Sequence, residues 1–144
     1  MPKAASIFLA VLFMAGCSSP GAAPPGGGTA TARVTGTVTY LQRIALPPTA
    51  VIKVQLVDVS RMDAPAVVLG EQIIQASGKQ VPFVFEISYD PARIEANRTY
   101  AVQARIEDDG ELLFINDTHY AVITRSAPTH VDMVLNAVDR PAAK

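Results

Sequence analysis

The residues of this chain that could bind a metal are few. Its two histidines are His119 and His130, and His130 lies two residues before Asp132, a spacing that puts both side chains on one face of a β-strand. Two ligands do not make a metal site, and the sequence supplies no further ligand nearby at a recognisable spacing. The pattern favours surface polar residues on the outer face of the last strand, and we predict neither a metal nor a cofactor.

Carboxylates cluster around one dipeptide, Asp109-Gly110. Glu107 and Asp108 precede this turn and Glu111 follows it. Glycosidases need two carboxylates that flank a cleft, but Asp-Gly is also a strong signal for a tight β-hairpin turn, where acidic residues suit the backbone and solvent screens their charge. The cluster therefore predicts a hairpin turn in preference to an acid–base pair.

The sequence gives equally little support for a catalytic nucleophile. Ser60, Ser77 and Ser126 lie in predicted loops and none has the GxSxG elbow of a serine hydrolase. The single cysteine, Cys17, has a different predicted role. The sequence thus gives no catalytic residue, and we predict a protein that is not an enzyme.

The N-terminus resembles a secretory signal. Lys3 precedes an apolar run from Ala4 to Ala15, which is shorter than the roughly 20 residues that a membrane-spanning helix needs. Met14-Ala15-Gly16-Cys17 resembles a lipobox, the cleavage signal of bacterial lipoproteins, although that pattern prefers leucine where Met14 stands. We predict a signal peptide over residues 1–16; a plain secretory signal with a free cysteine is the alternative.

Lipoprotein maturation would attach a diacylglyceryl group and usually an N-acyl chain to Cys17, and two or more chains hold a protein stably on a membrane. Ser18, the next residue, implies export to the outer membrane. Residues 17–32 are rich in Gly, Pro, Ala, Ser and Thr, so they predict a flexible tether that reaches roughly 20 Å. The predicted location is the periplasmic face of the outer membrane.

Length, charge and cysteine content limit the number of domains, the kinds of partner and the disulfides that the chain can have. The chain has 144 residues and a formal charge of -1, and removal of Lys3 with the signal leaves 11 basic and 13 acidic residues, or -2. One domain fits this length. No basic run points to nucleic acid, and a single cysteine forms no internal disulfide.

Alternating hydrophobicity predicts β-strands through the rest of the chain. The clearest stripe is Val81, Phe83, Phe85, Ile87 and Tyr89, and Asp90-Pro91 after it predicts a short helical turn that ends near Ala96-Asn97. The predicted strands cover residues 33–40, 52–56, 67–75, 81–89, 100–107, 112–115, 120–124 and 130–135. This profile is typical of a β-sandwich or a partly closed barrel. We predict one all-β domain over residues 33–136, a single antiparallel β-sandwich of seven to eight strands, followed by a polar tail over 137–144.

Several apolar residues fall in loops or on predicted outer faces, namely Leu46, Val84, Leu113 and Ile115. Both faces of the strand over residues 112–115 are hydrophobic. One interpretation is a central strand buried on both sides, and the other is a groove or patch that accepts a partner.

Three blocks of residues together resemble a known family. They are Val34-Thr35-Gly36-Thr37-Val38 with Ala45-Leu46-Pro47-Pro48 and Val54 to Ser60; Pro82-Phe83 with Tyr89-Asp90-Pro91; and Gly110-Glu111-Leu112-Leu113-Phe114 with Asn116-Asp117. The combination is similar to the YbaY/YscW family of lipoproteins, which includes the pilotins of type III secretion, and covers roughly residues 34–135. The resemblance implies an outer-membrane lipoprotein with a β-sandwich domain, whose partner is a secretin or another outer-membrane protein.

Three functions follow as hypotheses. The first is a non-enzymatic, lipid-anchored module that binds or escorts an envelope protein. The second is a glycan- or peptidoglycan-binding module, although such modules usually stack sugars on exposed aromatic rings and this chain has no tryptophan. The third is an envelope hydrolase.

Replacing the predicted lipid-attachment residue tests the anchor. Cys17→Ser should leave the domain folded and move the protein from the membrane to the soluble fraction, because the acyl chains supply the membrane affinity. Cell fractionation followed by immunoblotting measures this, and unchanged membrane association would contradict the predicted anchor.

Overall fold

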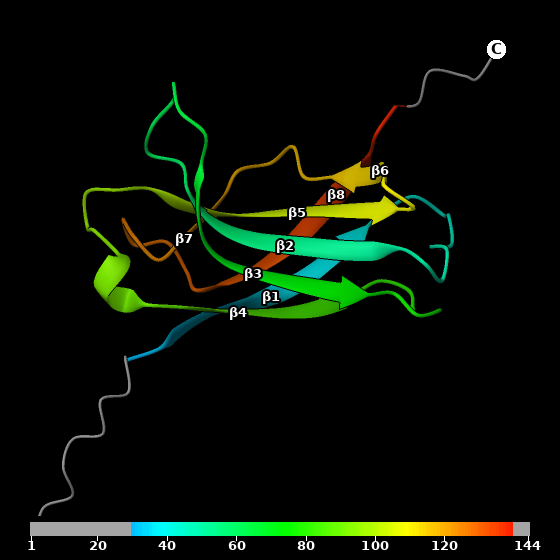
Figure 1. Ribbon diagram of the computed structural model, residues 1–144, viewed down its shortest axis with the longest axis horizontal. Helices are drawn as coiled ribbons and strands as arrows, with labels where there is room; N and C mark the ends of the chain where they lie inside the picture. The colour runs from blue at the N-terminus through cyan, green and yellow to red at the C-terminus, as the bar shows by residue number, and fades with distance from the viewer. Residues whose placement is uncertain (1–29, 140–144) are drawn as a thin grey trace, which may run out of the picture.

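The computed structural model describes residues 30–139 (Figure 1). The predicted signal peptide, Cys17, most of the tether and residues 140–144 lie outside the described residues. In the described range, no helix is long and apolar enough to span a membrane.

The described chain consists of eight strands and one 3-10 turn. They are β1 (Ala32–Tyr40), β2 (Val51–Asp58), β3 (Val67–Gln75), β4 (Phe83–Tyr89), η1 (Pro91–Arg93), β5 (Tyr100–Asp108), β6 (Glu111–Ile115), β7 (Tyr120–Val122) and β8 (His130–Ala137). The all-β prediction is confirmed. The predicted helical turn is present with Asp90 as its N-cap, whose side chain accepts a hydrogen bond from Ala92 N, but the turn ends at Arg93.

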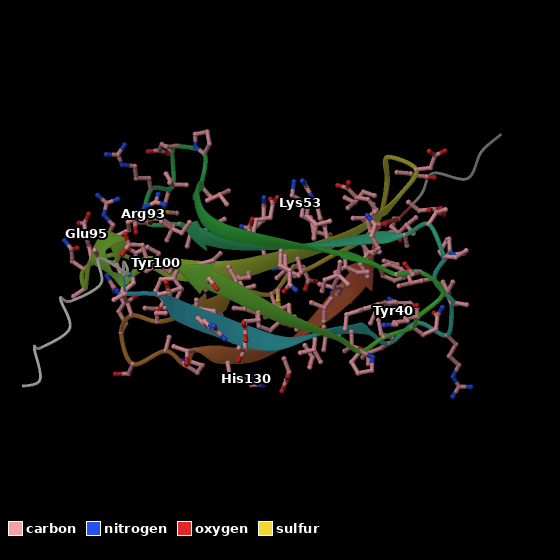
Figure 2. The ribbon with its side chains drawn as sticks, turned by 60° about the horizontal axis from the view of Figure 1, so that its bottom comes forward. Tyr40, Lys53, Arg93, Glu95, Tyr100 and His130 are labelled. Atoms are coloured by element: carbon pink, nitrogen blue, oxygen red, sulfur yellow. The ribbon has the colours of Figure 1, made fainter. Side chains whose placement is uncertain are left out.

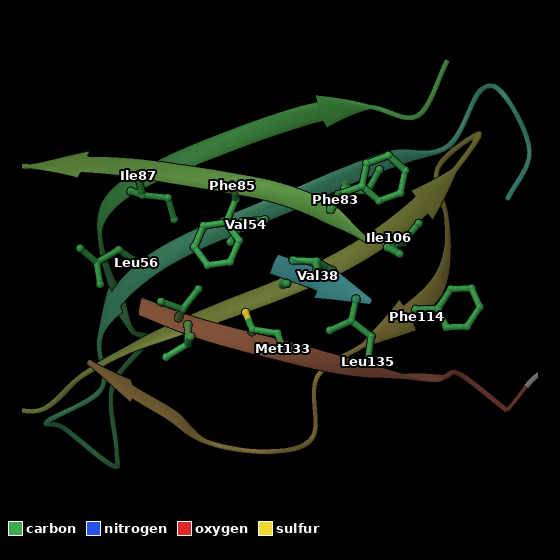
Figure 3. Packing of buried hydrophobic residues seen from close by; sticks show 14 of the residues in the cluster. Val38, Val54, Leu56, Phe83, Phe85, Ile87, Ile106, Phe114, Met133 and Leu135 are labelled. Carbon is green, nitrogen blue, oxygen red and sulfur yellow. The ribbon is translucent and has the colours of Figure 1, made fainter. Parts of the chain in front are cut away.

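Burial follows the alternation that the sequence shows. Along β4, Phe83, Phe85, Ile87 and Tyr89 are buried and the residues between them are exposed. These side chains join those of the other strands in one core, which Figure 3 shows around Phe85, Val54 and Met133. Among residues 30–139, every buried side chain belongs to a hydrophobic residue type, so packing of apolar surface holds the fold together.

The strands form one continuous hydrogen-bonded path in the order β3-β2-β5-β6-β8-β1-β4, with β7 paired to β5. All the strand pairs are antiparallel except β1 and β8, which run parallel. The two ends of the path also meet, because the backbone N–H of Glu86 on β4 donates to Oε1 of Gln72 on β3 at 2.6 Å. The sheet is therefore nearly closed and barrel-like, which corrects the predicted purely antiparallel sandwich.

Strand β8 is the physical reason for this correction. It pairs with β1 along one edge from His130 to Leu135, and Ala137 and Asn136 pair with Phe114 and Ile115 of β6 on the other side. In a sandwich of two separate sheets, no strand would pair with both sheets. Here β8 joins the β4-β1 pair to the β3-β2-β5-β6 sheet, so the layers become one curled surface.

Close approach of β1 to its neighbours depends on Gly36. A Cβ atom built on Gly36 would lie 1.8 Å from the carbonyl oxygen of Val131 on β8 and 2.9 Å from Cε1 of Phe85 on β4. No real side chain tolerates the first distance, so glycine is required where β1 is sandwiched between β8 and the core.

Substitution at this position should therefore be costly. Gly36→Ala should lower the free energy of unfolding by about 3 kcal/mol, since the added methyl group forces β1 and β8 apart. The matched control is Gly78→Ala, in a turn where no atom lies within 4 Å of the added methyl group and φ is +82°; it should cost about 1 kcal/mol through backbone strain alone. Urea denaturation measures both free energies of unfolding. Equal losses in the two variants would contradict the close contact between Gly36 and β8.

Candidate functional site

His130 and Asp132 lie on the surface and contact threonines of β1. Nδ1 of His130 lies 3.0 Å from Oγ1 of Thr35, and Oγ1 of Thr37 donates to Oδ1 of Asp132 at 2.8 Å. The side chains of His130 and Asp132 are 61% and 70% exposed and lie 3.4 Å apart (Nε2 to Oδ1). His119 is exposed in the loop before β7. Across residues 30–139, no three His, Cys, Asp or Glu side chains are grouped so that they could hold a metal ion.

The carboxylates around Asp109-Gly110 occupy a hairpin turn, as predicted. Asp109 and Gly110 both have positive φ, +48° and +79°, the conformation that two-residue hairpin loops require. Glu107 forms an ion pair with Arg105, Nε to Oε1 at 3.0 Å. Asp108 accepts a hydrogen bond from Oγ1 of Thr49 at 2.6 Å. The turn also has a role that the sequence did not reveal, because it brings Asp108 and Glu111 to the edge of a groove.

This groove is the candidate functional site. It has a volume of about 520 Å³ and lies between the loop after β1, the β5–β6 hairpin and the end of β8. Its lining residues are Ile44, Ala45, Leu46, Pro47, Asp108, Glu111, Leu113, Phe114, Ala137, Val138 and Asp139. Most of them are apolar, and Asp108, Glu111 and Asp139 form what we call the acidic rim. Such a volume is typical of sites that receive a ligand or a few large side chains.

One wall of the groove is fixed by Tyr40 at the end of β1. Its ring stacks on Phe114 of β6, with centroids 4.2 Å apart and planes 14° from parallel. Its hydroxyl donates to the carbonyl oxygen of Ile44 at 2.6 Å, and burial raises the pKa of Tyr40, which favours the protonated donor. Tyr40 therefore ties the loop that carries Ile44 to the sheet.

Two further contacts hold the other walls. The side-chain amide of Gln80 bridges both backbone groups of Leu46: Oε1 accepts from Leu46 N at 2.8 Å and Nε2 donates to Leu46 O at 3.3 Å. On the opposite side, the N–H of Val138 donates to the carbonyl oxygen of Leu113 at 2.9 Å and so extends the β6–β8 pairing by one bond. The groove is thus bounded by hydrogen-bonded backbone and is a preformed feature of the fold.

The four apolar residues singled out in the sequence separate into two groups. Leu46 and Leu113 line the groove. Ile115 and Val84 are 42% and 74% exposed and do not. Strand β6 has a neighbour on each side, β5 and β8, but Phe114 is its only buried residue. The prediction of a strand buried on both faces is therefore wrong, and the groove lies against β6. Ile44 and Val138 were missed, because nothing in the sequence places their loops beside β6.

A second polar cluster lies at the other end of the sheet. The guanidinium of Arg98 contacts Asp58 (Nη1 to Oδ2, 2.9 Å) and Glu95 (Nε to Oε2, 3.0 Å), and the Ser60 N–H donates to Asp58 Oδ1. Burial tends to raise the pKa of Asp58, but the hydrogen bonds from Ser60 and the charge of Arg98 outweigh it and lower the pKa. These groups satisfy one another, which indicates a structural clamp between two loops.

The groove and the start of β1 lie at opposite ends of the domain. Figure 2 shows Tyr40 at one end and Arg93, Glu95 and Tyr100 at the other. Ala32, the first residue of β1, pairs with Tyr89, next to the 3-10 turn. The nine residues of β1 separate the two ends by roughly 25 Å at the usual rise of a strand.

Comparison with known proteins finds similarity to a solved pilotin and to a lipoprotein. A solved structure described as an alternative pilotin from the type II secretion system of Vibrio cholerae matches with a TM-score of 0.74 and 49% sequence identity, and the match covers 77% of this chain and all of the other. Lipoprotein YbaY of Escherichia coli (strain K12) is 40% identical over 109 residues. That alignment covers 76% of this chain and 57% of the relative, so the chain matches little more than half of YbaY.

The family itself is established by a family model. The model described as type III secretion system lipoprotein chaperone (YscW) matches residues 29–135, which include seven complete strands and most of β8. The chain belongs to this family, and the resemblance predicted from its sequence motifs is confirmed.

Proposed function

We propose that this chain is a lipid-anchored chaperone of the outer membrane, and that its groove binds a segment of an envelope protein for which a secretin is the favoured candidate. The observation that carries the proposal is a preformed apolar groove of about 520 Å³ in a domain of the YscW family. Pilotins of the resembled family bind secretin subunits. The similarity to a solved pilotin over that protein's full length supports the same type of activity here.

The predicted lipid anchor would attach to the domain at the end opposite the groove, which suits the proposed activity. With Cys17 lipidated, the tether enters β1 at Ala32, at the end opposite the groove. A tether of roughly 20 Å leaves the domain free to turn above the membrane surface. The groove then lies at the end of the domain away from the attachment point, where an unassembled outer-membrane protein can reach it.

The surface of the domain gives little support to glycan binding. Sugar-binding modules stack their ligands on exposed aromatic rings, and among residues 30–139 each phenylalanine and tyrosine except Tyr120 is buried. Tyr120 is half-buried, and its hydroxyl accepts from the N–H of Val134 at 2.9 Å. We therefore favour a protein partner over a glycan. The description of the family as lipoprotein chaperones supports a non-enzymatic role.

Site-specific crosslinking in intact cells tests the proposal. The photoreactive residue p-benzoylphenylalanine replaces Ile44 in the groove or, as matched control, Val84 on the outer face of β4; both side chains are more than half exposed, 60% and 74%. We expect mass spectrometry to identify a secretin crosslinked through position 44 and not through position 84.

Capture through position 84 alone would place the binding surface elsewhere. Absence of a secretin or any other outer-membrane protein from both samples would contradict the chaperone function itself.

A further inference from the structure

The loop between β2 and β3, residues 59–66, presents apolar side chains to solvent. Met62 in its turn is 97% exposed, and residues 64–66 are exposed as well. The first two residues of β3, Val67 and Val68, are 53% and 44% exposed. From Met62 to Val68, Asp63 is the only polar residue. Single apolar residues are ordinary on a protein surface, whereas a continuous run of them marks a surface that an apolar partner covers.

This loop lies at the end of the domain where the predicted tether enters. A Cβ atom built on Gly70 of β3 would lie 2.8 Å from the carbonyl oxygen of Ser88, and Ser88 pairs with Arg33 at the start of β1. The loop itself begins where the N–H of Val59 donates to the carbonyl oxygen of Thr99 at 2.9 Å. Figure 1 shows the β2–β3 loop, η1 and the start of β1 at the same end of the domain.

The length of chain before this end indicates what covers the loop. Cys17 lies 15 residues before Ala32, the first residue of β1, and a tether of this length spans roughly 20 Å. With Cys17 lipidated, this end of the domain stays within reach of the membrane surface. Attachment raises the effective concentration of the loop beside the bilayer, so even a weak contact is populated. A lipid surface has this advantage over any partner that diffuses freely.

Charge at this end is balanced. Among residues 30–139, the loops over 59–66, 90–99 and 123–129, together with the last residue of β2, carry four arginines and four acids. They are Arg61, Arg93, Arg98, Arg125, Asp58, Asp63, Asp90 and Glu95. Residues 18–32 add no charge. Because the opposite charges cancel, apolar burial and not long-range attraction decides whether the loop enters a membrane.

We propose that the β2–β3 loop is a second membrane contact, which inserts Met62 and the apolar residues after it into the headgroup layer of the membrane that holds the lipid anchor. This inference rests on the anchor of the proposed function. Burial of Met62 and Val67 removes apolar area from water, and the carboxylate of Asp63 keeps the insertion shallow. The contact orients a domain that the tether alone leaves free to turn, and it holds the groove away from the bilayer.

Tryptophan fluorescence tests this contact, because the chain contains no tryptophan of its own. The variants are Met62→Trp and, as matched control, Leu41→Trp, which replaces a 79% exposed residue directly after β1, at the groove end. Residues 17–144 are coupled through Cys17 to phosphatidylcholine vesicles that contain a maleimide lipid. Emission of Met62→Trp should shift to shorter wavelength and fall about twofold when the vesicles contain brominated phosphatidylcholine. Emission of Leu41→Trp should not change.

A second pair of substitutions locates the effect in the apolar run. Added to Met62→Trp, Val67→Ser should weaken insertion by about threefold, because the side chain loses its apolar surface. The matched control is Ile73→Ser, which replaces a residue of β3 with the same exposure, 54% against 53%, further from the loop; it should leave the quenching unchanged. Circular dichroism verifies that each variant is folded.

The other outcomes contradict the contact. No quenching at position 62, or equal quenching at positions 62 and 41, would show that the loop does not orient the domain. A shift to shorter wavelength without quenching by brominated lipid would overturn the proposal in favour of a second copy of this chain as the occupant. Quenching that disappears in about 500 mM NaCl would contradict its apolar basis. None of these results bears on lipid attachment at Cys17 or on crosslinking at position 44, so the proposed function can stand if this inference fails.

Discussion

The arrangement of the domain depends on the two edges of β8. Along one edge β8 runs parallel to β1, where Gly36 leaves room for the carbonyl oxygen of Val131. On the other side, a short pairing with β6 joins the two parts of the sheet. Without that junction the two parts would be joined only by side-chain contacts, such as core packing and the hydrogen bond between Glu86 N and the Gln72 side chain, and by no strand pairing among the described residues. With it, the sheet curls around one core and its ends meet at β3 and β4 (Figure 1).

The groove results from the same short pairing between β6 and β8. Because β6 and β8 pair over few residues, the chain beyond Ala137 lies beside Leu113 and leaves an apolar hollow next to it. Tyr40 closes one side by stacking on Phe114. The proposed function gains from this construction, because a groove held by backbone hydrogen bonds loses little conformational freedom when a partner enters it.

The strands could be predicted from the sequence because strand burial is a local property. Phe83, Phe85 and Ile87 alternate with exposed residues regardless of which strand lies beside them. The parallel pairing of β1 with β8 joins residues 95 positions apart, such as Thr35 and His130, and no local pattern encodes it. The groove was foreseen only in part for the same reason: Leu46 and Leu113 stood out as apolar residues in unexpected places, whereas Ile44, Asp108 and Val138 become neighbours only after the sheet has closed.

Amide hydrogen exchange of residues 18–144, measured with and without the secretin identified by crosslinking, tests the central claim most directly. If the groove is the binding surface, the partner should slow exchange at amides that line it, such as those of Leu46 and Val138, and leave the amides of the loops beside Arg98, at the opposite end, unchanged. Slower exchange confined to those loops, or to the outer face of β1 and β8, would contradict the account.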